Sequence, residues 1–192
     1  MENMNVEFEQ IKNRNFSRLL NPRPALLVTC CDNDGKPNVL SVAWHSPLSI
    51  SPPLVGISIA PTRYSHDLIA STGEYVINVV GSEMRSVVDF CGNKSGREID
   101  KITQSSLRIQ PASMVRPPIL SDSLGYLECR VENAVVVGDH TWFVGIVLYA
   151  AARKEIFSDT WDADRSKVLL YLKLDQYGYF KNLDEFGSTD AK

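Results

Sequence analysis

The stretch LVGISIAPTRYSHDLIASTG, residues 54–73, joins an apolar run to a short helical pattern. Residues 54–59 are typical of a buried strand. Residues 68–69 are apolar and Gly73 follows shortly after them, which predicts one or two helical turns closed by a glycine. The intervening residues 63–67, Arg-Tyr-Ser-His-Asp, therefore open a helix.

A helix that starts at residues 63–67 offers a place for an anion. Its first N–H groups are unpaired and carry partial positive charge, and we expect Arg63 and the Ser65 hydroxyl to face the same place. The simpler alternative is that Ser65 or Asp67 only caps the helix, while Arg63 is a solvated surface charge. The stretch alone is compatible with either interpretation.

Strand signals dominate the first half of the chain. Residues 25–31 form an apolar run that ends in Asp-Asn-Asp-Gly, where Gly35 can supply the positive φ of a hairpin. One strand over residues 38–46 should follow, because apolar and more polar side chains alternate along it. One face of this strand then packs and the other meets a ligand.

A long antiparallel hairpin is predicted in the second half of the chain. Apolar and charged residues alternate over residues 127–132, residues 138–139 carry a Gly-Asp turn signal, and a second strand begins near Trp142. Helical patterns are few.

The helical patterns cover residues 8–20, the turn after Ser65, and residues 83–90, with Ser82 as the N-cap and Gly92 as the stop signal of the last. Strands do not alternate with helices, and the sequence contains no G-x-G-x-x-G, so a Rossmann domain is excluded. The pattern predicts an all-β barrel with helical decorations.

Length and composition agree with one domain. The chain has 192 residues, of which 44% are hydrophobic and 22% charged, enough for a single core. We expect one domain over residues 1–192, with a helical extension at 1–22 and a core at about 23–180. A net charge of −3 gives no electrostatic footprint for nucleic acid, and no signal sequence or membrane span is recognisable, so we expect a cytoplasmic protein.

The four cysteines, Cys30, Cys31, Cys91 and Cys129, show neither a C-x-x-C pair nor the spacing of metal ligands. Cys30 and Cys31 are adjacent in a strand, so their side chains point to opposite faces and do not bridge easily. We expect inert, buried thiols and no metal site.

Eight motif blocks occur in an order that resembles the flavin reductase-like family, which includes flavoredoxin, from Arg23 to about Tyr179. The blocks lie at residues 23–24, 32–38, 41–48, 52–59, 63–68, 75–79, 91–97 and 138–141. The resemblance implies a split β-barrel with Greek-key antiparallel strands that binds FMN, usually as a homodimer. A flavin carries the electron chemistry itself, so the protein need only position and tune it.

The resemblance also implies which residues hold the cofactor. One strand runs along the ring edge, the end of the next strand approaches the ribityl chain, and two basic motifs hold the phosphate. The implied cofactor-binding residues are Asn38, Ser41, Ala43, Trp44, His45, Ser46, Ser58, Ile59, Arg63, Ser65, His66, Ser95, Gly96 and Arg97. For Trp44 a core position is the alternative, for Arg97 a surface ion pair with Glu98 or Asp100, and Asn78 is a weaker candidate with a backbone partner as its alternative.

The three histidines all fall in matched motifs. His66 belongs to the phosphate motif or simply to the helix start. The family places the turn of His140 near the open face of the flavin, where it could meet nicotinamide as the catalytic residue, although an exposed turn residue is unremarkable. His45 could approach His140 around a metal, a weak case without further ligands. For the cysteines, the alternative to inert thiols is that Cys31 lies near the flavin.

Two functions from different classes follow from the resemblance. The first is an FMN-dependent oxidoreductase that takes hydride from NADH or NADPH and passes electrons to flavin, ferric iron or a protein. The second is an FMN-binding electron carrier without turnover of NAD(P)H. We also expect a homodimer, because strand faces such as the one with Trp142, Val144 and Ile146 and the one with Phe143 and Val147 exceed what one barrel covers.

Overall fold

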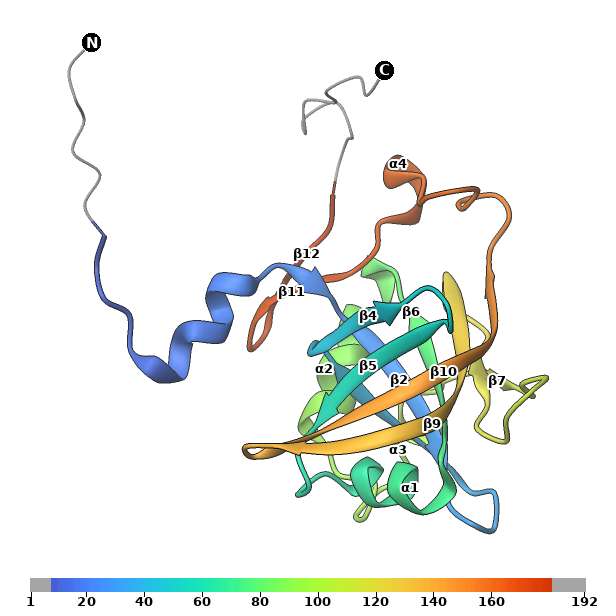
Figure 1. The fold of residues 1–192 in the computed structure, drawn as a ribbon. Coiled ribbons are helices and arrows are strands. Elements are labelled where there is room, and N and C mark those ends of the chain that lie inside the picture. The colour runs from blue at the N-terminus through green and yellow to red at the C-terminus, as the bar shows by residue number, and fades with distance from the viewer. Residues whose placement is uncertain (1–7, 181–192) are drawn as a thin grey trace.

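The computed structural model describes residues 8–180, and seven of its strands form one antiparallel sheet that curls into a barrel (Figure 1). The strand order is β3-β2-β6-β9-β10-β5-β4, in which three of the six neighbouring pairs are consecutive in sequence and three are not. The split β-barrel of the prediction is confirmed. The seven strands are β2 (Leu26–Cys31), β3 (Pro37–Val42), β4 (His45–Ser49), β5 (Leu54–Ile59), β6 (Glu74–Val79), β9 (Gly125–Val137) and β10 (His140–Ala152).

The barrel is split between β3 and β4, which are the two edges of the sheet although they follow each other in sequence. The prediction of one strand over residues 38–46 is therefore wrong. β3 pairs with β2 and β4 pairs with β5, so Ala43 and Trp44 must carry the chain from one edge to the other. The Ser58 N–H donates to the Trp44 carbonyl at 2.9 Å and ties this step to β5, the strand beside the β4 edge.

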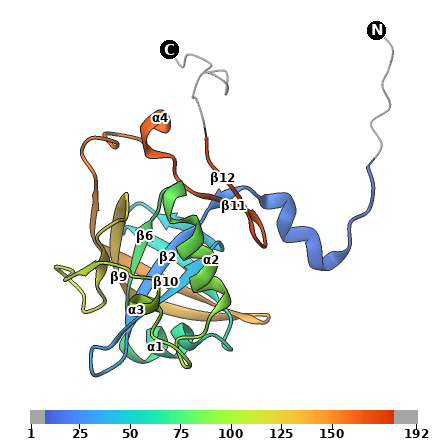
Figure 2. The same cartoon turned by 180° about the vertical axis from the view of Figure 1, so that it is seen from behind.

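Smaller elements surround the barrel. A three-stranded sheet has the order β1-β11-β12, and β7 pairs with β8. Four α-helices lie against or beside the strands (Figure 2). The bounds are β1 (Arg23–Pro24), β7 (Ile109–Gln110), β8 (Ile119–Leu120), β11 (Leu170–Lys173), β12 (Gln176–Gly178), α1 (Tyr64–Thr72), α2 (Arg85–Asn93), α3 (Lys101–Gln104) and α4 (Ala163–Ser166). No helix among residues 8–180 combines the length and apolarity needed to cross a bilayer.

Two helical predictions need correction. The helix predicted over residues 8–20 is a 3₁₀ helix over Asn13–Leu20, because Lys12 at its start has no capping side-chain bond and the helix packs no apolar face on the barrel. The helix predicted over 83–90 begins with a 3₁₀ turn at Ser82–Met84, and Ser82 does not cap it. Gly92 does not stop α2, which continues to Asn93, so Gly92 lies in its last turn.

The turn glycines are confirmed. Gly35 and Gly138 have φ of +85° and +61° and close the two predicted hairpins, and Gly73 ends α1 with a φ of +70°. Such positive φ values are free of strain only for glycine.

The core fills the inside of the barrel, with Tyr75 and Phe143 among its largest fully buried side chains. Phe143 of the predicted exposed face is thus only 1% exposed, whereas Trp142 faces outward and covers Gly56 so closely that a Cβ there would lie 2.4 Å from the indole ring. Asn78 is fully buried, donates to the Leu27 carbonyl and accepts from a backbone N–H, so its partner is the protein itself.

Glu128 is the unforeseen member of the core. The alternating pattern predicted that its side chain would lie on a polar face, but it is fully buried. Its carboxylate accepts the backbone N–H groups of Ser113 and Met114, so it pins the loop between β7 and β8 to β9. A loop with unpaired N–H groups thereby gains acceptors that the sheet cannot supply.

We predict that Gly145→Ala destabilises the fold. A Cβ at Gly145 would lie 2.2 Å from the Tyr75 hydroxyl oxygen, and Tyr75 is fully buried. Overpacking of this kind costs about 1–3 kcal/mol in the free energy of unfolding. Urea denaturation measures it, and Tyr75→Phe in the same chain should reduce the loss by removing the nearest atom. Equal losses with and without Tyr75→Phe would contradict this contact as the cause.

Candidate functional site

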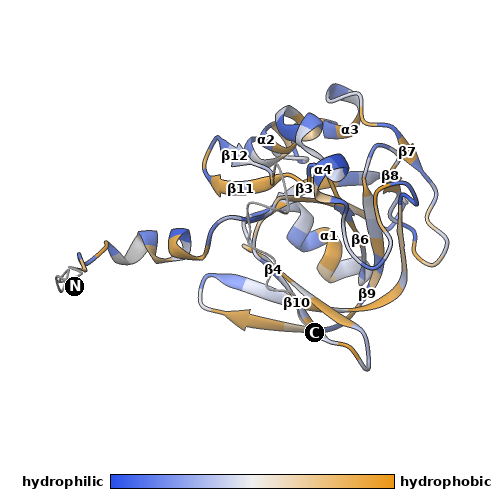
Figure 3. Ribbon diagram, turned by 90° about the horizontal axis from the view of Figure 1, so that it is seen from above, coloured by the Kyte–Doolittle hydropathy of each residue, from blue (hydrophilic) through white to orange (hydrophobic). Residues whose placement is uncertain are grey.

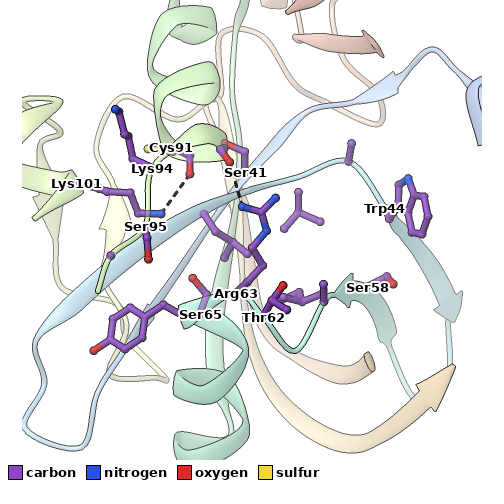
Figure 4. Close-up of a pocket in the computed structure, with 18 of the residues that line it drawn as sticks. Ser41, Trp44, Ser58, Thr62, Arg63, Ser65, Cys91, Lys94, Ser95 and Lys101 are labelled. Atoms are coloured by element: carbon purple, nitrogen blue, oxygen red, sulfur yellow. Dashed lines mark hydrogen bonds between the residues drawn. The ribbon is translucent and has the colours of Figure 1, made fainter. Parts of the chain in front are cut away.

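A cavity of about 480 Å³ opens at the split of the barrel (Figure 4). The five consecutive residues 40–44 form one wall, the end of β5 and the start of α1 form another, and the loop after α2 closes one end. The lining residues are Leu40, Ser41, Val42, Ala43, Trp44, Ser58, Ile59, Ala60, Thr62, Arg63, Tyr64, Ser65, Cys91, Gly92, Lys94, Ser95, Gly96, Lys101 and His140.

The cavity brings together ten of the fifteen predicted site residues. These ten are Ser41, Ala43, Trp44, Ser58, Ile59, Arg63, Ser65, Ser95, Gly96 and His140. The other five, whose side chains do not line the cavity, are Asn38, His45, Ser46, His66 and Arg97.

One end of the cavity is built for an anion. Arg63 is the residue before the first turn of α1, and no side chain caps this turn, so Ser65 is not the helix cap of the alternative interpretation. Ser65 is 2% exposed and points into the cavity. The Arg63 guanidinium donates to the Gly92 carbonyl at 3.3 Å, which holds it over the same end. The first N–H groups of α1 add their partial positive charge.

Asn38 lies behind this end and acts on it through Ser65. Its amide nitrogen donates to the Ser65 hydroxyl oxygen at 2.7 Å, so the Ser65 hydroxyl hydrogen is left to donate elsewhere. A Cβ at Gly96 would lie 2.2 Å from the Asn38 amide oxygen, so only glycine lets the 95–97 loop approach this closely. Asn38 therefore positions both walls without lining the cavity.

Lys101 is a cationic cavity residue that the sequence analysis missed. It is only 4% exposed, and its Nζ donates to the Cys91 carbonyl at 3.2 Å. Burial lowers the pKa of its ammonium group from the ordinary 10.5. In sequence Lys101 belongs to a charge-rich run that is typical of a surface. The one local signal of its position is Asp100, which caps α3 and so makes Lys101 the first residue of this helix.

Trp44 and His140 form the other end of the cavity. Their ring centroids are 4.9 Å apart, and Trp44 is 36% exposed, so the alternative of a core tryptophan is wrong. The His140 Nδ1 lies 2.7 Å from the Asp139 carboxylate, which lowers the pKa of that carboxyl group. Because Trp44 sits on the step between two sheet edges, its ring is not enclosed by strands on either side.

The family assignment rests on this geometry together with comparison of the whole chain. Residues 17–178 match the family described as "Flavin reductase like domain". The protein belongs to this family. The resemblance seen in the sequence is thereby confirmed.

Three similar proteins illustrate the range of the family. An uncharacterized protein of Archaeoglobus fulgidus is 40% identical over 114 residues, which are 59% of this chain and 64% of that protein, so the match spans less than two thirds of the relative. The crystal structure of flavoredoxin from Methanosarcina acetivorans has a TM-score of 0.82 at 24% identity and covers 92% of this chain and 93% of its own. An FMN-binding protein from Thermus thermophilus, solved with p-hydroxybenzaldehyde, has a TM-score of 0.77 at 25% identity and covers 93% and 97%.

His66 and Arg97 belong to the flavin reductase-like motifs but turn away from the cavity. The His66 Nε2 lies 2.8 Å from the Thr141 hydroxyl, so this side chain ties α1 to the start of β10. Arg97 pairs with Asp67 and lies over the Tyr64 ring, so its surface partner is neither Glu98 nor Asp100. Both side chains therefore contact residues around α1 without lining the cavity.

His45 faces a second cavity, of about 550 Å³, on the other side of the β3–β4 step. Its Nε2 lies 2.9 Å from the Pro24 carbonyl, and burial lowers the pKa of its ring. His45 and His140 therefore do not face one another, and residues 8–180 hold no cluster of three potential metal-ligating side chains. Ser46 follows on β4 and bonds to the Pro47 carbonyl.

The cysteines lie where the inert interpretation expects them. All four are buried, and burial raises the pKa of Cys30 and of Cys91 to about 11. Cys31 does not line the flavin-sized cavity, whereas Cys91 does. The structure therefore gives no support to the alternative that Cys31 lies near a ligand in this cavity.

We predict that Lys101→Met weakens the affinity for a flavin more than Lys94→Met, because Lys101 is buried at the anion end and Lys94 is exposed. Losing a buried charge-assisted contact should cost about tenfold to a hundredfold in affinity. Quenching of flavin fluorescence measures both dissociation constants.

The lowered pKa gives the same residue a pH signature. In the protein without ligand, Lys101 loses its proton as the pH rises through a value below 10.5, and the affinity for a flavin should then fall. Lys101→Arg should remove this fall, because guanidinium stays protonated. An unchanged pH profile in Lys101→Arg would assign the fall to another group.

Proposed function

We propose that this protein binds FMN in the 480 Å³ cavity and works as an oxidoreductase that takes hydride from NAD(P)H. The observation that carries the proposal is the gathering of Arg63, Ser65 and buried Lys101 at one closed end of a cavity whose middle is apolar. A dianionic phosphate fits the closed end, because two cations, a hydroxyl donor and a helix N-terminus converge there. A cavity of this volume is in the range of cofactor sites.

The closed end favours FMN over FAD. Behind Asn38 and Gly96 the remaining space measures only about 20 Å³, room for little more than one water molecule. An adenylate attached to the phosphate could not continue in that direction. The similarity to an FMN-binding protein of Thermus thermophilus supports the same assignment.

The other residues along the cavity would contact the flavin ring and the molecule that exchanges electrons with it. Leu40, Val42 and Ile59 offer apolar contact in the middle, and residues 43–44, which leave edge strand β3, lie where a polar ring edge could meet backbone. A bound flavin supplies the hydride and electron transfer itself. Trp44 and His140 would then border the place where a nicotinamide or another acceptor approaches, and His140 would act on the transfer rather than on flavin binding.

The second candidate is an FMN-binding electron carrier without turnover of NAD(P)H. The similarity in fold to a flavoredoxin is the observation that favours it. Both candidates share the cofactor and differ in the electron donor. One anaerobic experiment separates them.

The purified protein should be yellow and should release FMN, not FAD, on heating, as chromatography of the released flavin will establish. Under anaerobic conditions NADH or NADPH should bleach the flavin absorption band within seconds to minutes. Reduction by dithionite but by neither nucleotide would favour the carrier. Release of FAD, or of no flavin, would contradict the cofactor assignment.

Arg63→Ala and His140→Ala should have different effects. Arg63 donates at the anion end, so its loss should weaken FMN binding about tenfold to a hundredfold. His140 lies at the mouth, so its loss should change the rate of anaerobic reduction with little change in FMN affinity. Equal losses of FMN affinity in both variants would mean that one residue has been given the wrong role.

A further inference from the structure

A third cavity, of about 460 Å³, adjoins the flavin-sized cavity. It lies between α2 and the hairpin of β11 and β12, which Figures 2 and 3 show side by side. Residues 41–44, Arg63 and Gly92 line both cavities, so the two share one wall and a cation stands where they meet. The volume is in the range of small-molecule sites. The third cavity is therefore a place for a ligand that reaches beyond the flavin.

The aromatic part of the third cavity comes from the hairpin. Tyr171 and Tyr177 both line it, with ring centroids 5.8 Å apart. Both rings pack against the core cluster under α2 and are only half-buried, so each keeps a surface that another flat ring can contact. The Leu174 N–H donates to the Tyr171 hydroxyl at 2.9 Å, which ties this ring to the turn of the hairpin. The cavity thus offers aromatic contact to a planar base.

Two carboxylates line the same cavity. Asp89 comes from α2, and Asp175 from the turn between β11 and β12. In the part of the chain that the structure describes, neither carboxylate forms a hydrogen bond or an ion pair, because Asn93 and Arg85 donate to the backbone carbonyls of these two residues. Burial, and then the Asp89 carboxylate, raise the pKa of Tyr177, so this charge acts on the ring. Two acceptors without a donor thus accompany the two aromatic rings.

An adenosine matches this set of groups. Its purine can pack on aromatic rings, and its ribose hydroxyls can donate to a carboxylate, the contact by which many NAD sites hold the ribose. A 2′-phosphate in place of the hydroxyl would put an anion against Asp89 and Asp175, which is unfavourable. A simple organic cation would satisfy the carboxylates but would make no use of the wall shared with the flavin-sized cavity.

We propose that the third cavity binds the adenosine half of the nicotinamide dinucleotide and that Asp89 and Asp175 select NADH over NADPH. Trp44 lines both cavities and stands beside His140, so the dinucleotide would run past Trp44 from the flavin to the third cavity. This inference rests on the proposed use of NAD(P)H. It adds which of the two nucleotides is taken and which residues decide the choice.

Binding of ADP-ribose, which contains the adenosine half and no nicotinamide, tests the site without any electron transfer. Calorimetry on the FMN-loaded protein should give a dissociation constant at least about tenfold lower for ADP-ribose than for 2′-phospho-ADP-ribose, because like charges in contact repel. Asp89→Asn with Asp175→Asn should bring the two constants within about threefold of each other. Asp34→Asn with Glu155→Gln removes the same charge from exposed residues outside both cavities and should keep the preference.

The kinetics of anaerobic flavin reduction separate this proposal from the proposed function. Half-maximal reduction should need about tenfold more NADPH than NADH in the wild type, and Asp89→Asn with Asp175→Arg should reverse this order, because a guanidinium accommodates the 2′-phosphate. Bleaching by both nucleotides, with equal dissociation constants for the two ADP-ribose compounds, would overturn the adenosine site and leave the proposed function standing. Selective binding of ADP-ribose without bleaching by either nucleotide would overturn the function and leave the adenosine site standing.

The adenylate of FAD is the other source of the same chemistry. The flavin-free protein should bind FAD no more tightly than FMN. Tighter binding of FAD that is lost in Asp89→Asn with Asp175→Asn would place the adenylate of the flavin cofactor in the third cavity and overturn the proposal.

Discussion

The site depends on how the seven-stranded sheet closes. β3 and β4 are its two edges, and only Ala43 and Trp44 connect them. Edge strands carry backbone N–H and C=O groups that no neighbouring strand satisfies. A barrel that closed completely would use all of these groups in hydrogen bonds, whereas this one keeps some of them beside a cavity. The split is thus what places edge-strand backbone beside a cavity.

The anion end follows from the same closure. β5 ends at Ile59 beside the split, and α1 starts at Tyr64, so the helix N-terminus is delivered to the cavity without a long loop. Asn38, on the facing edge strand, reaches Ser65 at 2.7 Å. The loop after α2 completes this end because Gly96 has no side chain to keep it away from Asn38. Three segments distant in sequence therefore converge on one end of the cavity.

Local rules of the sequence predicted much of this. The strand before residue 59, the helix start at 63–67, and the glycines that end turns depend on near neighbours, and a sequence displays near neighbours. Features set by tertiary packing could not be predicted in the same way. Lys101 and Glu128 sit in runs whose polarity is typical of exposed faces, yet both are buried because distant backbone groups partner them.

The β3–β4 step shows the same limit most clearly. The alternation of residues 40–45 was compatible with one strand over residues 38–46, and nothing local marks where a strand leaves one sheet edge for another. The consequence for the site was specific. The prediction placed Trp44 and His45 together in one flavin site. In the structure Trp44 lines the 480 Å³ cavity, whereas His45 lines the second cavity of about 550 Å³.

This division gives adjacent residues different surroundings and joins the two cavities through one short backbone segment. The Trp44 carbonyl accepts the Ser58 N–H of β5, while the His45 Nε2 is hydrogen-bonded to the Pro24 carbonyl of β1. The first cavity has cations at one end and apolar side chains along its middle, whereas the second cavity is lined mainly by apolar side chains. The incomplete closure of the barrel accounts for the two cavities, because one lies on each side of the β3–β4 step.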